Sequence, residues 1–315
     1  MIGQSTAFRA LLPLIEKCAA YDAPVLIEGE TGTGKELAAR EIHYRSARRD
    51  RPFVPVNCGS IPDTLLESEL FGHRRGAFTD ARHDQLGLVA LAHSGTLFLD
   101  EVDALTPKAQ VTLLRFLQDQ RYRPLGARRE ERADARIIAA SNRPLDALVD
   151  AGTFRIDLLY RLKLMQLVLP PLRDRRGDIP ILSQHFLEIG SARFGRPVQF
   201  LAAETIDWFE RYAWPGNIRE LEHTVYHGLL LCEGSVILLA PPPSLAAQTL
   251  DAGAAPTYRH AKELAIADFE HAYLVRLIDQ ANGNVSVAAR LAGTERRHFG
   301  RLLKKHRLSK SSPQM

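Results

Sequence analysis

Residues 25–37 read VLIEGETGTGKEL, and this stretch decides the fold. Val25–Ile27 form an apolar run typical of a buried strand, and a helical pattern, Leu37–Arg45, follows the loop. The letters between them match G-x-x-x-x-G-K, the pattern of a phosphate-binding loop, in the strand–loop–helix context that makes the match specific. The glycines let backbone N–H groups converge on phosphate oxygens, while the helix start and Lys35 supply positive charge. The predicted nucleotide-binding residues of this loop are Gly29, Glu30, Thr31, Gly32, Thr33, Gly34, Lys35 and Glu36, the last replacing the Ser/Thr of the generic motif.

A second apolar strand, residues 95–101 with the sequence GTLFLDE, ends in two acidic residues. Asp100 is suited to hold Mg²⁺, directly or through water, and Glu101 to polarise the water that attacks a phosphate. We therefore expect ATP and Mg²⁺ as cofactors and predict catalytic roles for both residues, with Asp100 as the metal ligand.

The composition bounds the class of protein. The 315 residues are 45% hydrophobic and 25% charged, as in a soluble globular protein of roughly two domains. No apolar run approaches the ~20 residues of a membrane helix, and no signal-peptide pattern opens the chain. The widely spaced Cys18, Cys58 and Cys232 argue against a disulfide framework and a cysteine-based zinc site, and they fit a reducing cytoplasm.

The organisation of the chain follows from periodicity. Short β-rich runs alternate with helical patterns over the first 170 residues, which predicts an α/β fold with a mostly parallel sheet. Strands are expected at Pro24–Glu28, Phe53–Asn57, Thr96–Asp100, Arg136–Ser141 and Lys163–Leu169. Residues 178–234 predict helices only, at Ile179–Phe194, Glu204–Tyr212 and Asn217–Cys232.

The remaining residues predict a linker and a helical C-terminal domain. Ala240–Pro256 is rich in Pro and Ala and lacks periodicity, whereas a helical pattern resumes near His260 and runs to about His306. The predicted segments are an α/β subdomain (1–171), a helical lid subdomain (172–239), a linker (240–259), a helix-turn-helix domain (260–308) and a disordered tail (309–315).

Charge is concentrated at the C-terminal end. The net charge is +4, yet residues 281–315 hold eight basic residues and one acidic residue, a net +7, so residues 1–280 sum to −3. Asn284–Ala292 and Glu295–His306 predict two helices joined by a turn at Gly293–Thr294. In the second helix Phe299, Leu302 and Leu303 form an apolar stripe, which leaves the cations on other faces. Gly300 weakens that helix by ~1 kcal/mol relative to Ala. The predicted DNA-binding residues are Arg290, Arg296, Arg297, Arg301, Lys304 and Lys305.

Together, the phosphate loop and the strand that ends in Asp100 and Glu101 point to a family. The chain resembles the AAA+ central domain of bacterial sigma-54-dependent transcriptional activators. The family's phosphate loop also reads GETGTGKE, with glutamate after lysine. Residues 67–73 (ESELFGH) with 76–79 (GAFT) resemble the segment that leads into the family's sigma-contacting loop, and residues 214–221 (WPGNIREL) resemble its lid motif. The C-terminal helices resemble the Fis-type domain that usually ends these activators, although Gly300 stands where that pattern often has Tyr. The implied fold is an α/β AAA+ P-loop ATPase with a helical lid, followed by an all-α helix-turn-helix domain.

The resemblance also implies roles for individual residues. Asn57 resembles the asparagine that interacts with the catalytic glutamate, here Glu101, and Asn142 resembles the first sensor residue. Arg219 resembles the second sensor, in the lid. Arg155 and Arg161 resemble the paired arginine fingers, which in this family reach a neighbouring subunit's nucleotide, so the resemblance implies a homo-oligomeric ring, typically a hexamer and a dimer at rest. Ile156 stands where the family usually has Glu.

The sigma-contacting loop departs from the family at one position. The family sequence Gly-Ala-Phe-Thr-Gly-Ala is here Gly76, Ala77, Phe78, Thr79, Asp80 and Ala81. Glycine permits φ > 0 and close approach of a partner, whereas Asp tolerates that conformation less freely and adds a negative charge. Two interpretations stay open: the loop still engages sigma-54 with altered strength, or coupling to sigma-54 is lost.

Two main hypotheses follow. One is an ATP-hydrolysing ring that remodels sigma-54 RNA polymerase holoenzyme at promoters, with duplex DNA bound at a near-palindromic site. The other is a DNA-binding regulator or repressor that does not couple to sigma-54. A replication-initiator-like AAA+ protein shares the architecture but gives no reason for the GAFT loop. Since Met1–Ser5 coincide with the start of the family's central domain, either no regulatory domain precedes it or one was removed. We expect a bacterial, cytoplasmic, nucleoid-associated protein with no membrane partner.

Overall fold

The computed structural model describes residues 1–78, 80–197, 199–242, 273–274, 277, 281, 284–294 and 296–305. The chain divides into two compact units, Met1–Ala240 and Pro241–Met315. Thr79, most of the predicted linker, most of the helical stretch that begins at His260 and the predicted tail 309–315 lie outside the described residues.

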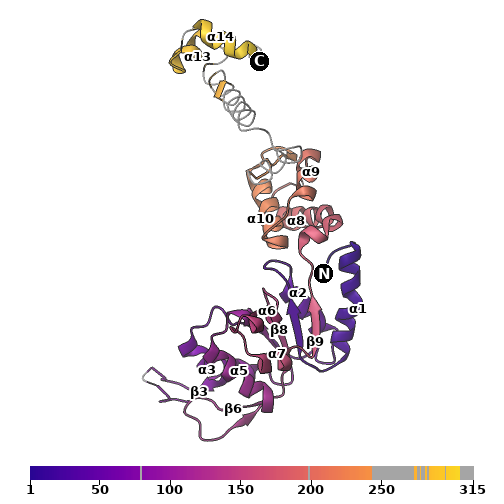
Figure 1. The fold of residues 1–315 in the computed structure, drawn as a ribbon, viewed down its shortest axis with the longest axis vertical. Coiled ribbons are helices and arrows are strands. Elements are labelled where there is room, and N and C mark those ends of the chain that lie inside the picture. The colour runs from indigo at the N-terminus through magenta and orange to yellow at the C-terminus, as the bar shows by residue number, and fades with distance from the viewer. Residues whose placement is uncertain are drawn as a thin grey trace. The chain divides into compact units, whose positions relative to one another are not determined.

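The first unit is built on a five-stranded parallel sheet, which confirms the predicted α/β fold class (Figure 1). Its strand order is β2-β5-β8-β1-β9, and every neighbouring pair is parallel. All residues of β1 and β8 are buried, as expected for central strands covered on both faces. The five strands are β1 (Val25–Glu28), β2 (Phe53–Asn57), β5 (Thr96–Asp100), β8 (Arg136–Ser141) and β9 (Met165–Val168). β2, β5 and β8 have the predicted bounds, whereas β1 and β9 are slightly shorter than predicted.

Helices cover both faces of this sheet. One core packs α1 and α2 against one face through residues such as Ile15, Ala38 and Ile27. The other core lies on the opposite face and includes Leu113 of α5 and Leu158 of α7. The helices of this layer are α1 (Thr6–Ala20), α2 (Lys35–Tyr44), α3 (Asp63–Phe71), α4 (Leu88–Leu91), α5 (Pro107–Asp119), α6 (Leu145–Asp150) and α7 (Ile156–Leu162), with a 3₁₀ turn, η1, at Val102–Ala104.

Two short hairpins extend the α/β layer. β3 (Gly72–His73) pairs antiparallel with β4 (Gln85–Leu86), and β6 (Arg121–Tyr122) pairs antiparallel with β7 (Glu131–Arg132). The two hairpins are joined, because Leu125 bridges to His73. Figure 1 places β3 and β6 next to each other.

A helical lid follows β9. It contains η2 (Leu172–Asp174), η3 (Arg176–Asp178), α8 (Ile179–Phe194), α9 (Ala203–Arg211) and α10 (Asn217–Leu231). The three predicted lid helices are confirmed within one residue at each end. The prediction of helices only is wrong, because β10 (Phe200–Leu201) pairs in parallel with β11 (Val236–Ile237). A strand of two residues leaves no periodic pattern in the sequence, and it forms only because tertiary packing brings the two segments together.

The second unit contains α13 (Val285–Leu291) and α14 (Arg296–Lys305). The Asn284 side chain caps α13 by accepting hydrogen bonds from the N–H groups of Ser286 and Val287. Gly293 has φ +62° in the connecting turn. Of the predicted stripe, Phe299 and Leu303 are buried and Leu302 is partly buried. In the part of the chain that the structure describes, no helix combines the length and apolar character needed to cross a membrane.

Candidate functional site

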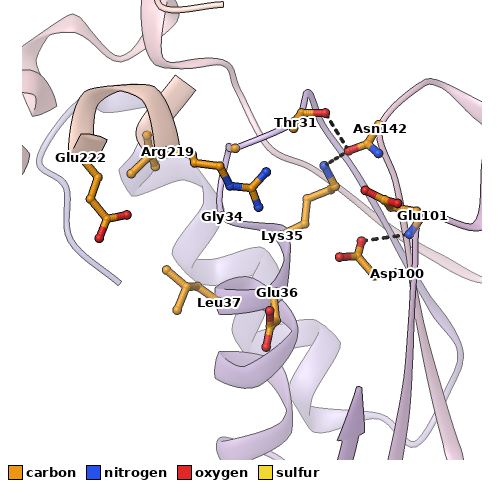
Figure 2. A pocket seen from close by; sticks show the side chains of 12 residues that line it. Thr31, Gly34, Lys35, Glu36, Leu37, Asp100, Glu101, Asn142, Arg219 and Glu222 are labelled. Atoms are coloured by element: carbon orange, nitrogen blue, oxygen red, sulfur yellow. Dashed lines mark hydrogen bonds between the residues drawn. The ribbon is translucent and has the colours of Figure 1, made fainter. Parts of the chain in front are cut away.

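A pocket of about 230 Å³ lies at the carboxyl ends of β1, β5 and β8 (Figure 2). Because these strands are neighbours in the sheet, residues that follow them in sequence meet at one edge. Lys35 follows β1, Asp100 ends β5 and Asn142 follows β8. The predicted site residues that line the pocket are Thr31, Gly32, Gly34, Lys35, Glu36, Asp100, Glu101, Asn142 and Arg219.

The phosphate loop holds its lysine against backbone carbonyls. Lys35 Nζ donates to the carbonyl oxygens of Gly29 (2.8 Å) and Glu30 (3.1 Å) and to Asn142 Oδ1 (2.7 Å). Burial lowers the pKa of Lys35, while Asp100, Asp103 and Glu101 oppose that shift. Asn142 also accepts a hydrogen bond from Thr31 Oγ1 (3.2 Å), so it connects the loop to β8. The arrangement places one buried cation where phosphate oxygens can compete for its protons.

Two carboxylates stand opposite this lysine in Figure 2. Asp100 Oδ1 accepts a hydrogen bond from the Glu101 N–H (2.9 Å). Burial raises the pKa of Asp100, while that N–H and the Lys35 ammonium act to lower it. Glu101 has φ +56°, a left-handed conformation that costs a non-glycine residue energy and is found at functional sites.

One or two carboxylates suffice to hold Mg²⁺ beside phosphates, because the ion keeps several waters. Asp100 and Glu101, which both line the pocket, therefore fit this ion.

Asn57 and Glu101 converge on the backbone at Gly59. A Cβ at Gly59 would lie 2.7 Å from Glu101 Oε2 and 3.4 Å from Asn57 Oδ1, so both side chains end beside this glycine. Asn57 Oδ1 accepts a hydrogen bond from the Ser60 N–H (3.0 Å). Within the described structure the two side chains meet at one place but share no hydrogen bond.

The lid is bonded directly to the phosphate loop. The Ile218 N–H donates to the Gly32 carbonyl (3.0 Å), and a Cβ at Gly32 would lie 2.2 Å from the Gly216 carbonyl oxygen. Gly32 also has φ +79°. Glycine is required here because both the backbone conformation and the close lid exclude a side chain.

Asn217 completes this junction, and its role there could not be predicted beyond its place in the lid motif. Its side chain is fully buried at φ +52°. Nδ2 donates to the Thr31 carbonyl (3.0 Å) and to Glu30 Oε2 (3.2 Å), while Oδ1 accepts from the Leu172 N–H (2.8 Å). Glu30 is also held by Arg173 through two hydrogen bonds of 2.8 and 2.6 Å, which lower the pKa of the Glu30 carboxyl.

Two lid side chains line the pocket from α10. Figure 2 shows Arg219 directed toward Gly34 and Lys35, with Glu222 on the same helix. Glu36 lies on α2, where Arg40 holds its carboxylate through hydrogen bonds of 2.7 and 3.0 Å. This ion pair directs the Glu36 carboxylate along α2.

A second, largely apolar cavity of about 250 Å³ adjoins the first and shares Gly34, Leu37 and Ile218 with it. The sequence does not predict this cavity, because its walls come from four separate segments of the chain. The other lining residues are Met1, Ile2, Phe8, Thr33, Arg175, Leu182, His185 and Phe186.

A buried ion pair fixes the N-terminal wall of that cavity. Asp178 is fully buried and bonds Arg175 Nε at 2.9 Å. Asp178 also accepts hydrogen bonds from the Ser5 N–H (2.7 Å) and Ser5 Oγ (2.8 Å). The Arg175 guanidinium lies 4.7 Å from the centre of the Phe8 ring. Although burial acts to raise the pKa of Asp178, these hydrogen bonds hold it below its usual value.

The predicted arginine fingers lie outside the pocket. Arg155 precedes α7 and pairs with Asp157 (2.7 Å), and Arg161 is an exposed residue of that helix. The structure therefore does not bring either arginine to the nucleotide pocket of its own chain.

The predicted sigma-contacting loop joins β3 to β4. The Gly76 N–H donates to the Ala81 carbonyl (2.8 Å), and the Ala81 N–H donates to the Phe78 carbonyl (3.0 Å). Phe78 is exposed and meets the His73 ring edge-on, with ring centres 4.9 Å apart. Asp80 is exposed, and its backbone carbonyl accepts a hydrogen bond from the Arg82 N–H (2.8 Å).

The predicted DNA-binding cations of the second unit are exposed where their side chains are described. This holds for Arg290, Arg296, Arg297 and Arg301. The structure describes the backbone of Lys304 and Lys305 at the end of α14.

Comparison with known proteins identifies the family. The family model described as the sigma-54 interaction domain matches residues 1–168, and the AAA+ ATPase lid domain matches residues 173–255. The hydrogenase transcriptional regulatory protein HoxA of Bradyrhizobium diazoefficiens is 41% identical over 310 residues, which cover 96% of this chain and 63% of HoxA. The response regulator protein PilR of Pseudomonas aeruginosa is 41% identical over 310 residues, covering 97% of this chain and 69% of PilR.

A solved structure shares both fold and sequence with the chain. NtrX from Brucella abortus, in complex with ATP, superimposes with a TM-score of 0.73 at 32% identity, covering 97% of this chain and 69% of NtrX. The chain spans less than two thirds of the length of HoxA. We conclude that it belongs to the family of sigma-54-dependent transcriptional regulators and carries that family's AAA+ ATPase domain.

Proposed function

We propose that the chain hydrolyses ATP with Mg²⁺ and uses that energy to remodel sigma-54 RNA polymerase holoenzyme at promoters. The observation that carries the ATPase part is the convergence of Lys35, Asp100, Glu101 and Asn142 in one pocket. The apolar cavity beside it suits a flat purine base, because it offers Leu182, Phe186 and Ile218 as walls. A nucleotide bound across both cavities would place its phosphates on the loop.

Each charged side chain has a part in this chemistry. Lys35 exchanges its carbonyl partners for β- and γ-phosphate oxygens, and the left-handed backbone at Glu101 directs its carboxylate to the attacking water. Asp100 would hold Mg²⁺, which when bound would neutralise phosphate charge. Arg219 approaches the same phosphates from the lid.

The arginine fingers act on a neighbouring subunit in this proposal. Arg155, just before α7, and Arg161, on α7, are both exposed and lie outside their own pocket, which supports action in trans and therefore a ring, as the family resemblance implies. An arginine finger is worth ~10³–10⁵ in rate, or roughly 4–7 kcal/mol.

The loop with Phe78 and Thr79 is the proposed contact with sigma-54. The exposed Phe78 ring supports a loop that still engages its target, because the side chain is accessible to a partner. The alternative is that the added negative charge prevents docking and the protein regulates DNA without sigma-54.

DNA binding is assigned to residues 260–308, with 1–239 as the ATPase. Exposed Arg296, Arg297 and Arg301 on α14, above a buried Phe299 and Leu303, support a recognition helix. Two such units in an oligomer would read a near-palindromic site.

The deciding experiment is open-complex formation in vitro with sigma-54 holoenzyme, compared with housekeeping holoenzyme. We expect ATP-dependent opening with the former, and a larger yield for Asp80→Gly if the charge weakens docking. If neither the wild-type chain nor Asp80→Gly opened promoters with sigma-54 holoenzyme, the proposal would be contradicted. Glu101→Gln serves as the control, because it should bind ATP but not open promoters.

A further inference from the structure

The β6–β7 hairpin carries an electrostatic arrangement that its own fold does not explain. Residues 121–132 read RYRPLGARREER. Arg121 and Arg132 are direct partners across the two strands, and like charges in that position destabilise a hairpin. In the described part of the chain neither guanidinium has an ion-pair or hydrogen-bond partner.

Strand alternation turns this pair of arginines to solvent. Tyr122 and Glu131 occupy the other face, where Tyr122 is buried, donates a hydrogen bond to Glu131 Oε2 (2.9 Å) and stacks on Phe71. Since neighbouring residues of a strand point to opposite faces, Arg121 and Arg132 point away from the domain. Both are exposed.

The turn of the hairpin adds two more cations. Arg128 and Arg129 are exposed and, among the described residues, also lack a carboxylate partner, whereas Arg123 pairs with Glu130 (3.1 Å). We call Arg121, Arg128, Arg129 and Arg132 the arginine hairpin set. No side chain within 121–132 is an exposed large hydrophobic residue.

This hairpin lies against the base of the proposed sigma-contacting loop. The Leu125 N–H donates to the Gly72 carbonyl (2.9 Å), and the Arg74 N–H donates to the Leu125 carbonyl (2.8 Å). A Cβ at Gly126 would lie 3.0 Å from the Ala77 Cβ. A molecule that the proposed sigma-contacting loop contacts would therefore also lie close to the arginine hairpin set.

We propose that the arginine hairpin set binds the phosphate backbone of duplex DNA without reading its sequence. A protein partner would be expected to require apolar contact at the centre of the interface, which this surface lacks. All four residues are arginines, whose planar fork matches phosphate oxygens. The site goes beyond the proposed function, which assigns DNA contact to residues 260–308.

The test measures binding of a duplex with no operator sequence by fluorescence anisotropy at several salt concentrations. The full chain carries Arg297→Ala and Arg301→Ala throughout, so that binding by the second unit is weakened. Each phosphate contact contributes about 0.9 to the slope of log K against log salt. We therefore expect Arg121→Ala with Arg132→Ala to lower that slope by about 1.8, and Arg121→Lys with Arg132→Lys to keep it.

Arg9→Ala is the matched control, because Arg9 is exposed on α1 and, within the described structure, its side chain has no partner. It should leave the slope unchanged, and ATP binding should be equal in all variants if the fold is intact. An unchanged slope in the Arg121→Ala, Arg132→Ala variant would overturn the proposal. The proposal would also be overturned if the Arg121→Ala, Arg132→Ala variant lost binding to an acidic polypeptide such as polyglutamate but still bound DNA as the parent chain does. No polymerase is present, so failure here leaves the remodelling function untouched.

Discussion

The nucleotide pocket and the arginine hairpin set differ in whether their cations have acceptors within the protein. In the pocket, the Lys35 ammonium has three acceptors within 3.1 Å. On the hairpin, two arginines stand opposite each other across the strands with no acceptor from the described residues. The protein therefore holds the Lys35 ammonium in place with its own acceptors, whereas the described residues provide none for the two hairpin arginines. Pre-organisation favours catalysis, whereas unpaired surface charge favours reversible contact with a large polyanion.

The largest expected effect comes from breaking a charge pair that the protein satisfies internally. Asp178→Asn leaves the buried Arg175 guanidinium uncompensated and should lower the free energy of unfolding by about 3–5 kcal/mol. Because the folded pKa of Asp178 lies below its unfolded value of 3.8, the wild-type advantage is fully present above that value. It should disappear as pH falls further. Urea unfolding at neutral pH and near pH 3 checks both expectations, and a pH-independent difference would contradict the ion-pair account.

Removing the pocket cation tests the pocket itself. Lys35→Ala should weaken binding of a non-hydrolysable ATP analogue by roughly 100-fold, about 3 kcal/mol, because charge-assisted hydrogen bonds to phosphate are lost. Isothermal titration calorimetry measures this directly. Arg9→Ala, which removes an exposed cation far from the loop in sequence, should bind as the wild type does. Near-equal affinities for Lys35→Ala and wild type would rule out the pocket as the phosphate site.

The junction between lid and loop should have an intermediate effect. Asn217→Ala removes the side-chain bonds to Thr31 and Leu172 and leaves buried backbone groups unpaired, at a cost of about 1–3 kcal/mol. We expect nucleotide affinity to fall by about 10-fold, whereas Asn217→Asp should keep the bond from Leu172 and lose those to the loop. If Asn217→Ala lowers thermal stability alone and ATP affinity is unchanged, the junction is structural only.

The smallest effect is expected on the hairpin, and its sign is opposite. Arg132→Glu replaces a like-charge pair across the strands with an opposite-charge pair and should stabilise the fold by roughly 0.5 kcal/mol. The same change should weaken DNA binding in the assay described above. Thermal unfolding measures the gain in stability, and a parallel DNA titration measures the loss of DNA affinity. A destabilised Arg132→Glu variant would show that the arginine pair contributes to folding after all.

The main features of the nucleotide site could be predicted from sequence because they are local. A strand, a glycine loop and a helix start lie within the 13 residues 25–37, and β2, β5 and β8 have the predicted bounds. The predicted Asn142 meets Lys35 because β8 neighbours β1. The apolar cavity and the hydrogen bonds of Asn217 could not be predicted in this way, because no motif or periodicity records them and they form only where the lid packs against the α/β layer.

The sequence by itself determined the α/β class, the phosphate loop, the paired carboxylates and the family, since each depends on a short run of residues with fixed spacing. Only the tertiary structure decided which groups each charge meets. It bound the lid to the loop through Asn217, placed Arg155 and Arg161 outside their own pocket, and set Arg121 opposite Arg132. The physical reason is that periodicity records which face of an element is buried, whereas the partners of a charge are set by packing between elements.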